Sequence, residues 1–202
     1  MMDVTAQGSE QNFWMDSPLR YGLISRVLHW VMAYLLVWQF TTILLWRLGG
    51  PTDWVKTITS FGPYHGTVGW VTVILVVIRA IWAMINRRRR PAHGGGRLAA
   101  AARAGHVVLY GLMFAIPALA LLRSYGNGKG WKLWGVQIIP ETGVEIGWMI
   151  APANAMHSVL AWCLSAAILG HVAMAFIHRL VFRDRTLATM AGPLRPVARQ
   201  AG

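Results

Sequence analysis

The chain has 202 residues, of which 55% are hydrophobic and only 13% are charged. This composition is too apolar and too poor in charge for an ordinary soluble domain. The net charge of +12 invites a nucleic-acid-binding interpretation, but the basic residues cluster beside apolar stretches rather than along one soluble face. The sequence therefore predicts a protein of the lipid bilayer and excludes a nucleic-acid partner.

Apolar windows of roughly twenty residues are typical of transmembrane helices. The sequence contains four of them, at about 27–46, 64–86, 105–123 and 156–178. We therefore expect an all-α membrane protein, a bundle of four transmembrane helices within residues 21–190. Residues 1–20 are polar and carry no cleavable signal, so the first helix is expected to act as an uncleaved insertion signal behind a loose cytoplasmic tail.

The connections between the predicted helices differ in composition. Glycines and prolines in 47–63 break helices, and residues 91–97 are a flexible linker by composition. Pro117 is expected to kink the third helix or to have its freed carbonyl satisfied by neighbours. The longest connection, 124–154, is predicted to be a functional lid or a docking surface. Residues 191–202 form a second, C-terminal tail.

Arginines lie mainly at one side of the predicted helices. A run of four follows the second helix, and others precede the third helix and follow the fourth; these residues are Arg87, Arg88, Arg89, Arg90, Arg97, Arg103, Arg179, Arg183 and Arg185. Under the positive-inside rule this side is cytoplasmic. Four crossings then place both termini in the cytoplasm, and they place 47–63 and 124–154 on the opposite side.

Two histidines, His157 and His171, share the fourth apolar window. They are fourteen residues apart, which corresponds to about 21 Å of helix rise and nearly the same helix face. A histidine buried in a membrane is costly and is a candidate functional residue. Two of them on one stripe indicate a stack of two axially ligated haems across the bilayer.

The predicted topology sorts the histidines into two levels. His65 and His157 share the outer level, whereas His29, His106 and His171 share the inner level. A haem b held by two imidazoles needs one histidine from each of two facing helices at one depth. The outer level offers only His65 with His157, but His171 could pair with His29 or with His106, and spacing alone does not choose.

Other interpretations of the histidines are weaker. Zinc is the competing metal, but the helices carry no cysteine or carboxylate cluster to complete a tetrahedral site. His93 lies in the linker and is expected to be solvated, and His178 is expected to be interfacial. A non-redox alternative is a small transporter or scaffold whose histidines serve in packing or in a proton relay.

Arg79 supports the haem interpretation. It lies fourteen residues after His65, on the same helix face but at the inner level. No acidic residue lies within the four apolar windows, so haem propionates are the expected anionic partner; snorkelling to cytoplasmic headgroups is the alternative. Gly66 and Gly69 would let a flat macrocycle approach the backbone, or they could be small-residue helix contacts.

Five stretches carry a resemblance that covers about residues 19–190. They are RYGLISRVLHW (20–30), PYHGTVGWVTVILVVIRAIW (63–82), AGHVVLYGLMFAIPALALL (104–122), MHSVLAW (156–162) and LGHVAMAFIHRLVFRDRTLATM (169–190). The sequence resembles the prokaryotic cytochrome b561 family of four-helix, di-haem membrane proteins. No motif is individually rare, and the specificity comes from five histidines at family-like positions.

The resemblance implies that His29 pairs with His171 and that His65 pairs with His157. It leaves His106 as a non-ligand. It also implies a multi-pass protein of the bacterial inner membrane with two haems b. Some family members oxidise superoxide at the periplasmic face and reduce ubiquinone, whereas others serve as cytochrome subunits of larger dehydrogenases.

We accordingly predict an oxidoreductase that transfers electrons from superoxide, or a similar one-electron donor, to ubiquinone. The alternative is an electron-transfer subunit that docks a redox protein through residues 124–154. Arg123, Lys129 and Lys132 could steer an anionic donor, or they could be ordinary interfacial anchors. The quinone is expected in the inner half near His106, which can donate to a carbonyl and relay a proton.

Overall fold

The computed structural model describes residues 13–91 and 95–193. Four long helices dominate these residues: α1 (Leu23–Gly49), α3 (His65–Ile85), α4 (Gly96–Gly126) and α5 (Gly147–Leu180). All four are long and apolar enough to cross a membrane. Only 6% to 22% of their most apolar windows is buried inside the protein, so most of their apolar surface is left for lipid.

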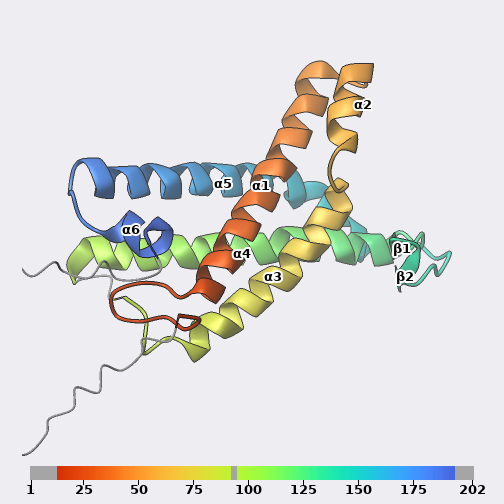
Figure 1. Ribbon diagram of the computed structural model, residues 1–202. Coiled ribbons are helices and arrows are strands. Elements are labelled where there is room, and N and C mark those ends of the chain that lie inside the picture. The colour runs from red at the N-terminus through yellow and green to blue at the C-terminus, as the bar shows by residue number, and fades with distance from the viewer. Residues whose placement is uncertain (1–12, 92–94, 194–202) are drawn as a thin grey trace, which may run out of the picture.

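The four helices form two pairs that cross obliquely (Figure 1). Helix α1 packs along α3 and helix α4 packs along α5, while α3 also contacts α4. The buried core lies at the crossing and contains Met32, Val76, Met113, Ile116 and Leu164, contributed by all four helices. The predicted all-α membrane fold with four spanning helices is therefore confirmed.

The connection between α1 and α3 contains a short helix that the sequence analysis did not predict, α2 (Asp53–Ser60). Helix α1 ends at Gly49, and Gly50 adopts a left-handed conformation with φ of 62°, which glycine tolerates without strain. Val55 of α2 is fully buried against the end of α1, where a Cβ on Gly49 would lie 2.7 Å from its side chain. The connection therefore folds back as an amphipathic cap.

Two helices begin nine residues earlier than predicted. Helix α4 starts at Gly96 rather than at about residue 105, and α5 starts at Gly147 rather than at about residue 156. Helix α4 runs through Pro117 without interruption, and Pro152 lies within the second turn of α5. The linker 91–97 is consequently shorter than expected.

The connection from α4 to α5 contains a small hairpin, β1 (Trp131–Leu133) paired antiparallel with β2 (Val136–Ile139). Trp134 and Gly135 form its two-residue turn, with φ of 46° and 86°. Positive φ at both central residues is the signature of a type I′ turn, which suits a tight hairpin. We call this side of the molecule the hairpin end.

The opposite end is closed by the segment 13–22, which we call the strap, and by α6 (Thr186–Ala191). The strap lies between the start of α1 and the end of α3 (Figure 1). The carboxylate of Asp16 is fully buried, accepts a hydrogen bond from the backbone N–H of Gly22 at 2.9 Å and pairs with Arg90 at 3.0 Å. Residues 13–20 are therefore held against the bundle rather than loose, whereas residues 1–12 of the predicted tail lie outside the described residues. We call this side the basic end.

The corner between α5 and α6 is fixed by His178, whose Nδ1 lies 2.5 Å from a carboxylate oxygen of Asp184. This hydrogen bond, helped by the backbone N–H of Thr186, lowers the pKa of Asp184 from 3.8 to about 2. His178 thus serves a local structural contact. His93, also considered above, lies outside the described residues.

Candidate haem-binding site

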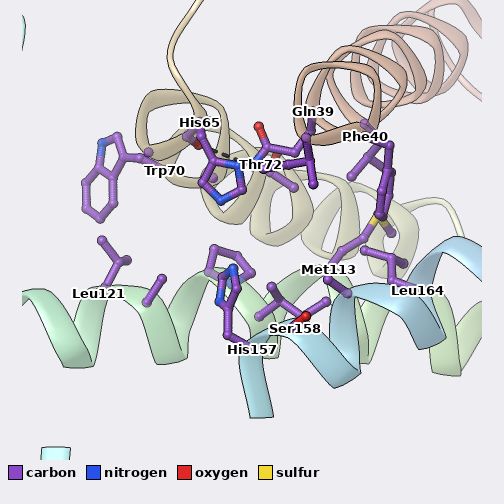
Figure 2. Close-up of a pocket in the computed structure, with 18 of the residues that line it drawn as sticks. Gln39, Phe40, His65, Trp70, Thr72, Met113, Leu121, His157, Ser158 and Leu164 are labelled. Atoms are coloured by element: carbon purple, nitrogen blue, oxygen red, sulfur yellow. Dashed lines mark hydrogen bonds between the residues drawn. The ribbon is translucent and has the colours of Figure 1, made fainter. Parts of the chain in front are cut away.

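At the hairpin end, His65 and His157 face each other across a cavity of about 430 Å³ (Figure 2). Their ring centroids are 6.0 Å apart. A metal ion lies about 2 Å from an imidazole nitrogen, so two rings that bind one ion from opposite sides have centroids about 6 Å apart. The observed separation matches that arrangement.

The position of His65 follows from its place in the chain. It is the first residue of α3, directly after the extended residue Tyr64. Two side chains of α1 hold this helix start: the indole N–H of Trp38 donates to the carbonyl of Pro63 at 3.0 Å, and the Gln39 amide donates to the carbonyl of His65 at 3.2 Å. His157 lies ten residues into α5, so both rings are carried by rigid helices.

The walls of this cavity are mostly apolar and come from α1, α3, α4, α5 and β1. Gly66 and Gly69 line it together with the two histidines. A Cβ on Gly66 would lie 3.3 Å from the indole nitrogen of Trp131, whereas a Cβ on Gly69 would come no closer than 3.8 Å to Pro117. Gly66 therefore lets the Trp131 ring of the hairpin close over the cavity.

Polar groups are few in this cavity, and two of them were missed by the sequence analysis. Arg47 lines it and lies with its guanidinium 5.7 Å from the ring centre of Trp162. The side-chain oxygen of Gln39 is buried and has no hydrogen-bond partner among the described residues. A buried acceptor of this kind is costly unless a bound group supplies a donor. The signal for Arg47 was present in the sequence, as a cation at the end of an apolar helix.

At the basic end, three imidazoles converge. The ring centroids of His29 and His171 are 6.2 Å apart, and those of His106 and His171 are 5.4 Å apart. The Nδ1 of His106 lies 2.7 Å from the backbone carbonyl of Ala102, so this nitrogen carries the proton and donates. The structure thus brings together all three inner-level histidines that the sequence analysis grouped.

Arg79 lies at this end, as its spacing from His65 predicts. Its guanidinium donates to Nδ1 of His29 at 3.0 Å and lies 5.5 Å from the ring centre of Tyr110. Among the described residues it makes no ion pair with a carboxylate. A partly buried guanidinium that has no anionic partner among the described residues can bind an anion that enters the bundle.

The three cations considered for steering are exposed near the hairpin. Arg123 lies at the end of α4, and its Nε donates to the side-chain oxygen of Asn154 at 2.8 Å. Lys129 lies two residues before β1, and Lys132 is the middle residue of β1. All three therefore face the hairpin end, where they add positive charge outside the His65–His157 cavity.

The geometry thus places two histidine pairs on four apolar helices, and comparison with known proteins identifies the family. The family model for prokaryotic cytochrome b561 matches residues 20–193. The chain belongs to the prokaryotic cytochrome b561 family. The predicted resemblance is thereby confirmed.

Two relatives extend this assignment. The chain is 30% identical over 185 residues to cytochrome b561 homolog 2 of Escherichia coli, which covers 88% of this chain and 94% of that protein. It is 26% identical over 175 residues to the probable superoxide oxidase CybB of Yersinia pestis, with 85% and 95% covered. Cytochromes of this family bind haem b and transfer electrons, and the chain is accordingly a multi-pass inner-membrane protein.

Proposed function

We propose that this cytochrome b561 holds two haems b, one between His65 and His157 and one between His29 and His171. The observation that carries the proposal is the pair of imidazole contacts, 6.0 and 6.2 Å between centroids, that recur at the two ends of the same bundle. The second members of these pairs lie fourteen residues apart on α5. These four histidines would hold the two groups, and haem b would supply one-electron transfer there.

At the basic end, His29 is preferred over His106 as the partner of His171. The 6.2 Å separation agrees better than 5.4 Å with the distance of about 6 Å for a shared metal ion. If His29 held the iron through Nε2, its Nδ1 would carry the proton, and Arg79 would exchange its present contact with that nitrogen for an anion. A haem propionate is such an anion and suits the bidentate guanidinium.

The visible spectrum and the haem content of the purified protein test this proposal. We expect two haems per chain in the wild type, and one per chain in each of the variants His157→Ala and His29→Ala. His106→Ala is the matched control at the basic end, since it removes a third imidazole from the same cluster, and it should retain both haems. A colourless protein made with ample haem supply, or a haem lost only from His106→Ala, would refute the assignment.

We further propose that electrons come from superoxide and pass to ubiquinone. The relative named as a probable superoxide oxidase supports the donor, and the exposed cations Arg123, Lys129 and Lys132 provide a positive surface for an anion. Electrostatic steering of this kind falls steeply with ionic strength. Neutralising all three residues should slow superoxide-driven haem reduction and flatten its salt dependence; an unchanged rate would contradict the steering role.

The quinone is assigned to the basic end, near His106 and His171. The Nδ1–H of His106 is held by the carbonyl of Ala102, which fixes the ring within the helix bundle. His106→Ala should impair reduction of added ubiquinone while the haem spectrum stays unchanged. The arginines of this end favour a cytoplasmic location for it and for both termini.

A second candidate function is that of an electron-transfer subunit in a larger dehydrogenase. The hairpin favours it, because Trp134 at its tip is 82% exposed and Val136 is 63% exposed. A bulky side chain at positive φ is strained, and such strain is often retained for function. Copurification of a stoichiometric redox partner that is lost in Trp134→Gly would support this function, whereas turnover by the isolated protein would support superoxide oxidation.

A further inference from the structure

The basic end carries two arginines whose charge is not neutralised. Arg26 is only 7% exposed, and its guanidinium donates to the backbone carbonyls of Tyr21, Thr189 and Gly192. These acceptors are neutral. Arg20 directly precedes Tyr21, whose carbonyl accepts from Nε of Arg26 at 2.9 Å, so the two arginines are neighbours.

One donor of this pair is also unused. The Nη1 atom of Arg20 is buried and has no hydrogen-bond partner among the described residues. The two acids that the structure describes at this end are already engaged, Asp16 with Arg90 and Asp184 with His178. Within residues 13–91 and 95–193, neither Arg20 nor Arg26 forms an ion pair. Two neighbouring guanidinium groups, one with a buried unpaired donor, therefore have no anionic partner within the described part of the chain and suit a bound anion.

The surface around Arg20 indicates which anion suits it. Trp14 and Leu19 of the strap are 56% and 69% exposed, on the same segment as Arg20. Apolar and aromatic side chains beside a cation at the end of membrane-spanning helices are typical of the headgroup level of a bilayer. A free anion in solution would gain nothing from these apolar side chains, whereas a phospholipid would contact them with its acyl chains.

We propose that Arg20 and Arg26 bind the phosphodiester of one anionic phospholipid, whose acyl chains lie beside Trp14 and Leu19. The lipid belongs to the leaflet next to the basic end. The bound lipid neutralises the two arginines and joins the strap to the membrane. This site requires only that the helices span a bilayer, so it is independent of the haem assignment and of the electron donor.

Native mass spectrometry of the purified, haem-loaded protein tests the proposal. Detergent-solubilised protein is titrated with phosphatidylglycerol or with the zwitterionic phosphatidylcholine, and the first bound lipid is counted. Wild-type protein should bind phosphatidylglycerol in preference. Because each basic residue near a membrane surface contributes about 1 kcal/mol, Arg20→Gln should weaken this binding about 5-fold. Arg20→Lys should recover part of the loss, since it keeps the charge but not the planar fork.

The matched control is Arg88→Gln, which removes the same charge from an exposed residue in the arginine run that follows α3. It should bind phosphatidylglycerol within about 2-fold of wild type, as expected for an exposed charge. Equal losses of affinity in Arg20→Gln and Arg88→Gln would overturn the site and indicate diffuse attraction. An unchanged affinity in Arg20→Gln would also overturn the site.

Inorganic phosphate is tested as a competing ligand. If millimolar phosphate displaces the lipid through Arg20, the ligand is a small anion and the lipid assignment is wrong. Unchanged haem content in each variant confirms that the bundle is intact.

Discussion

The buried ion pair between Asp16 and Arg90 offers a direct test of how the strap is held. The Asp16 side chain is fully buried, whereas that of Arg90 is 24% exposed. The change Asp16→Asn keeps an oxygen that can accept from the backbone N–H of Gly22. It removes the negative charge, however, and can leave an amide donor facing the Nε donor of Arg90.

The magnitude follows from the burial of the two partners. Breaking a buried pair by removing one charge costs about 3–5 kcal/mol. Arg90 retains part of its hydration, so the lower end of the range, about 3 kcal/mol, applies here. For a protein of this size a loss of about 3 kcal/mol corresponds to a fall in melting temperature of roughly 6–12 °C.

Thermal unfolding of the detergent-solubilised, haem-loaded protein, followed by far-ultraviolet circular dichroism, measures this fall. The control is Asp53→Asn on α2, which removes an ion pair with Lys56 in which the two side chains are 102% and 56% exposed. That pair should contribute less than about 1 kcal/mol. If Asp16→Asn melts no lower than Asp53→Asn, then the buried pair does not hold the strap and the reasoning fails.

Three further predictions concern single side chains. Asp184 has a lowered pKa of about 2, so its stabilising contribution is complete above its ordinary value of 3.8 and is lost as the pH falls toward 2; melting temperatures of wild type and Asp184→Asn should converge over that interval. Gly22→Ala should lower the melting temperature, because its Cβ would lie 2.4 Å from a backbone carbonyl oxygen. Gly66→Ala should shift the haem absorption spectrum more than Gly69→Ala, since only the former Cβ is closer than 3.4 Å to a neighbour.

Hydropathy did not predict where α4 and α5 begin. The first turns of α4, from Gly96, contain a run of alanines that favours a helix but is interrupted by arginines, so they lie outside the apolar window. The second turn of α5 contains Pro152, a residue that usually argues for a boundary because it lacks the helical N–H donor, although prolines are tolerated within membrane-spanning helices. Both helices therefore extend beyond the segments that hydropathy marks.

The packing of the strap could not be predicted for a different reason: it depends on a contact between residues far apart in the sequence. Asp16 stands in a polar stretch with the composition of a tail, and its partner Arg90 is 74 residues away. Nothing within either segment identifies the other. Only the packing of α1 against α3 brings the two side chains together, so a contact of this kind has to be seen in three dimensions.

Histidine spacing, by contrast, constrained the candidate site closely, and the reason is geometric. Rise along a helix is fixed, so spacing gives the depth of each histidine directly. Rotation about the bundle axis is not fixed by spacing, which is why His29 and His106 were equivalent partners of His171 on sequence alone. The structure separates them in ring distance, 6.2 against 5.4 Å, and the wider separation favours His29.

Each end of the bundle has an arginine near its histidine pair. Histidine spacing predicted this for Arg79 but not for Arg47. Arg79 accompanies the histidines of the basic end, and Arg47 lines the cavity of the hairpin end. Each guanidinium packs near an aromatic ring, Tyr110 and Trp162 respectively. A cation beside each histidine pair favours the less positive, reduced state of an iron centre and offers a partner for a propionate. One arginine per histidine pair, on different helices, is therefore the arrangement that two haems stacked along α5 would need.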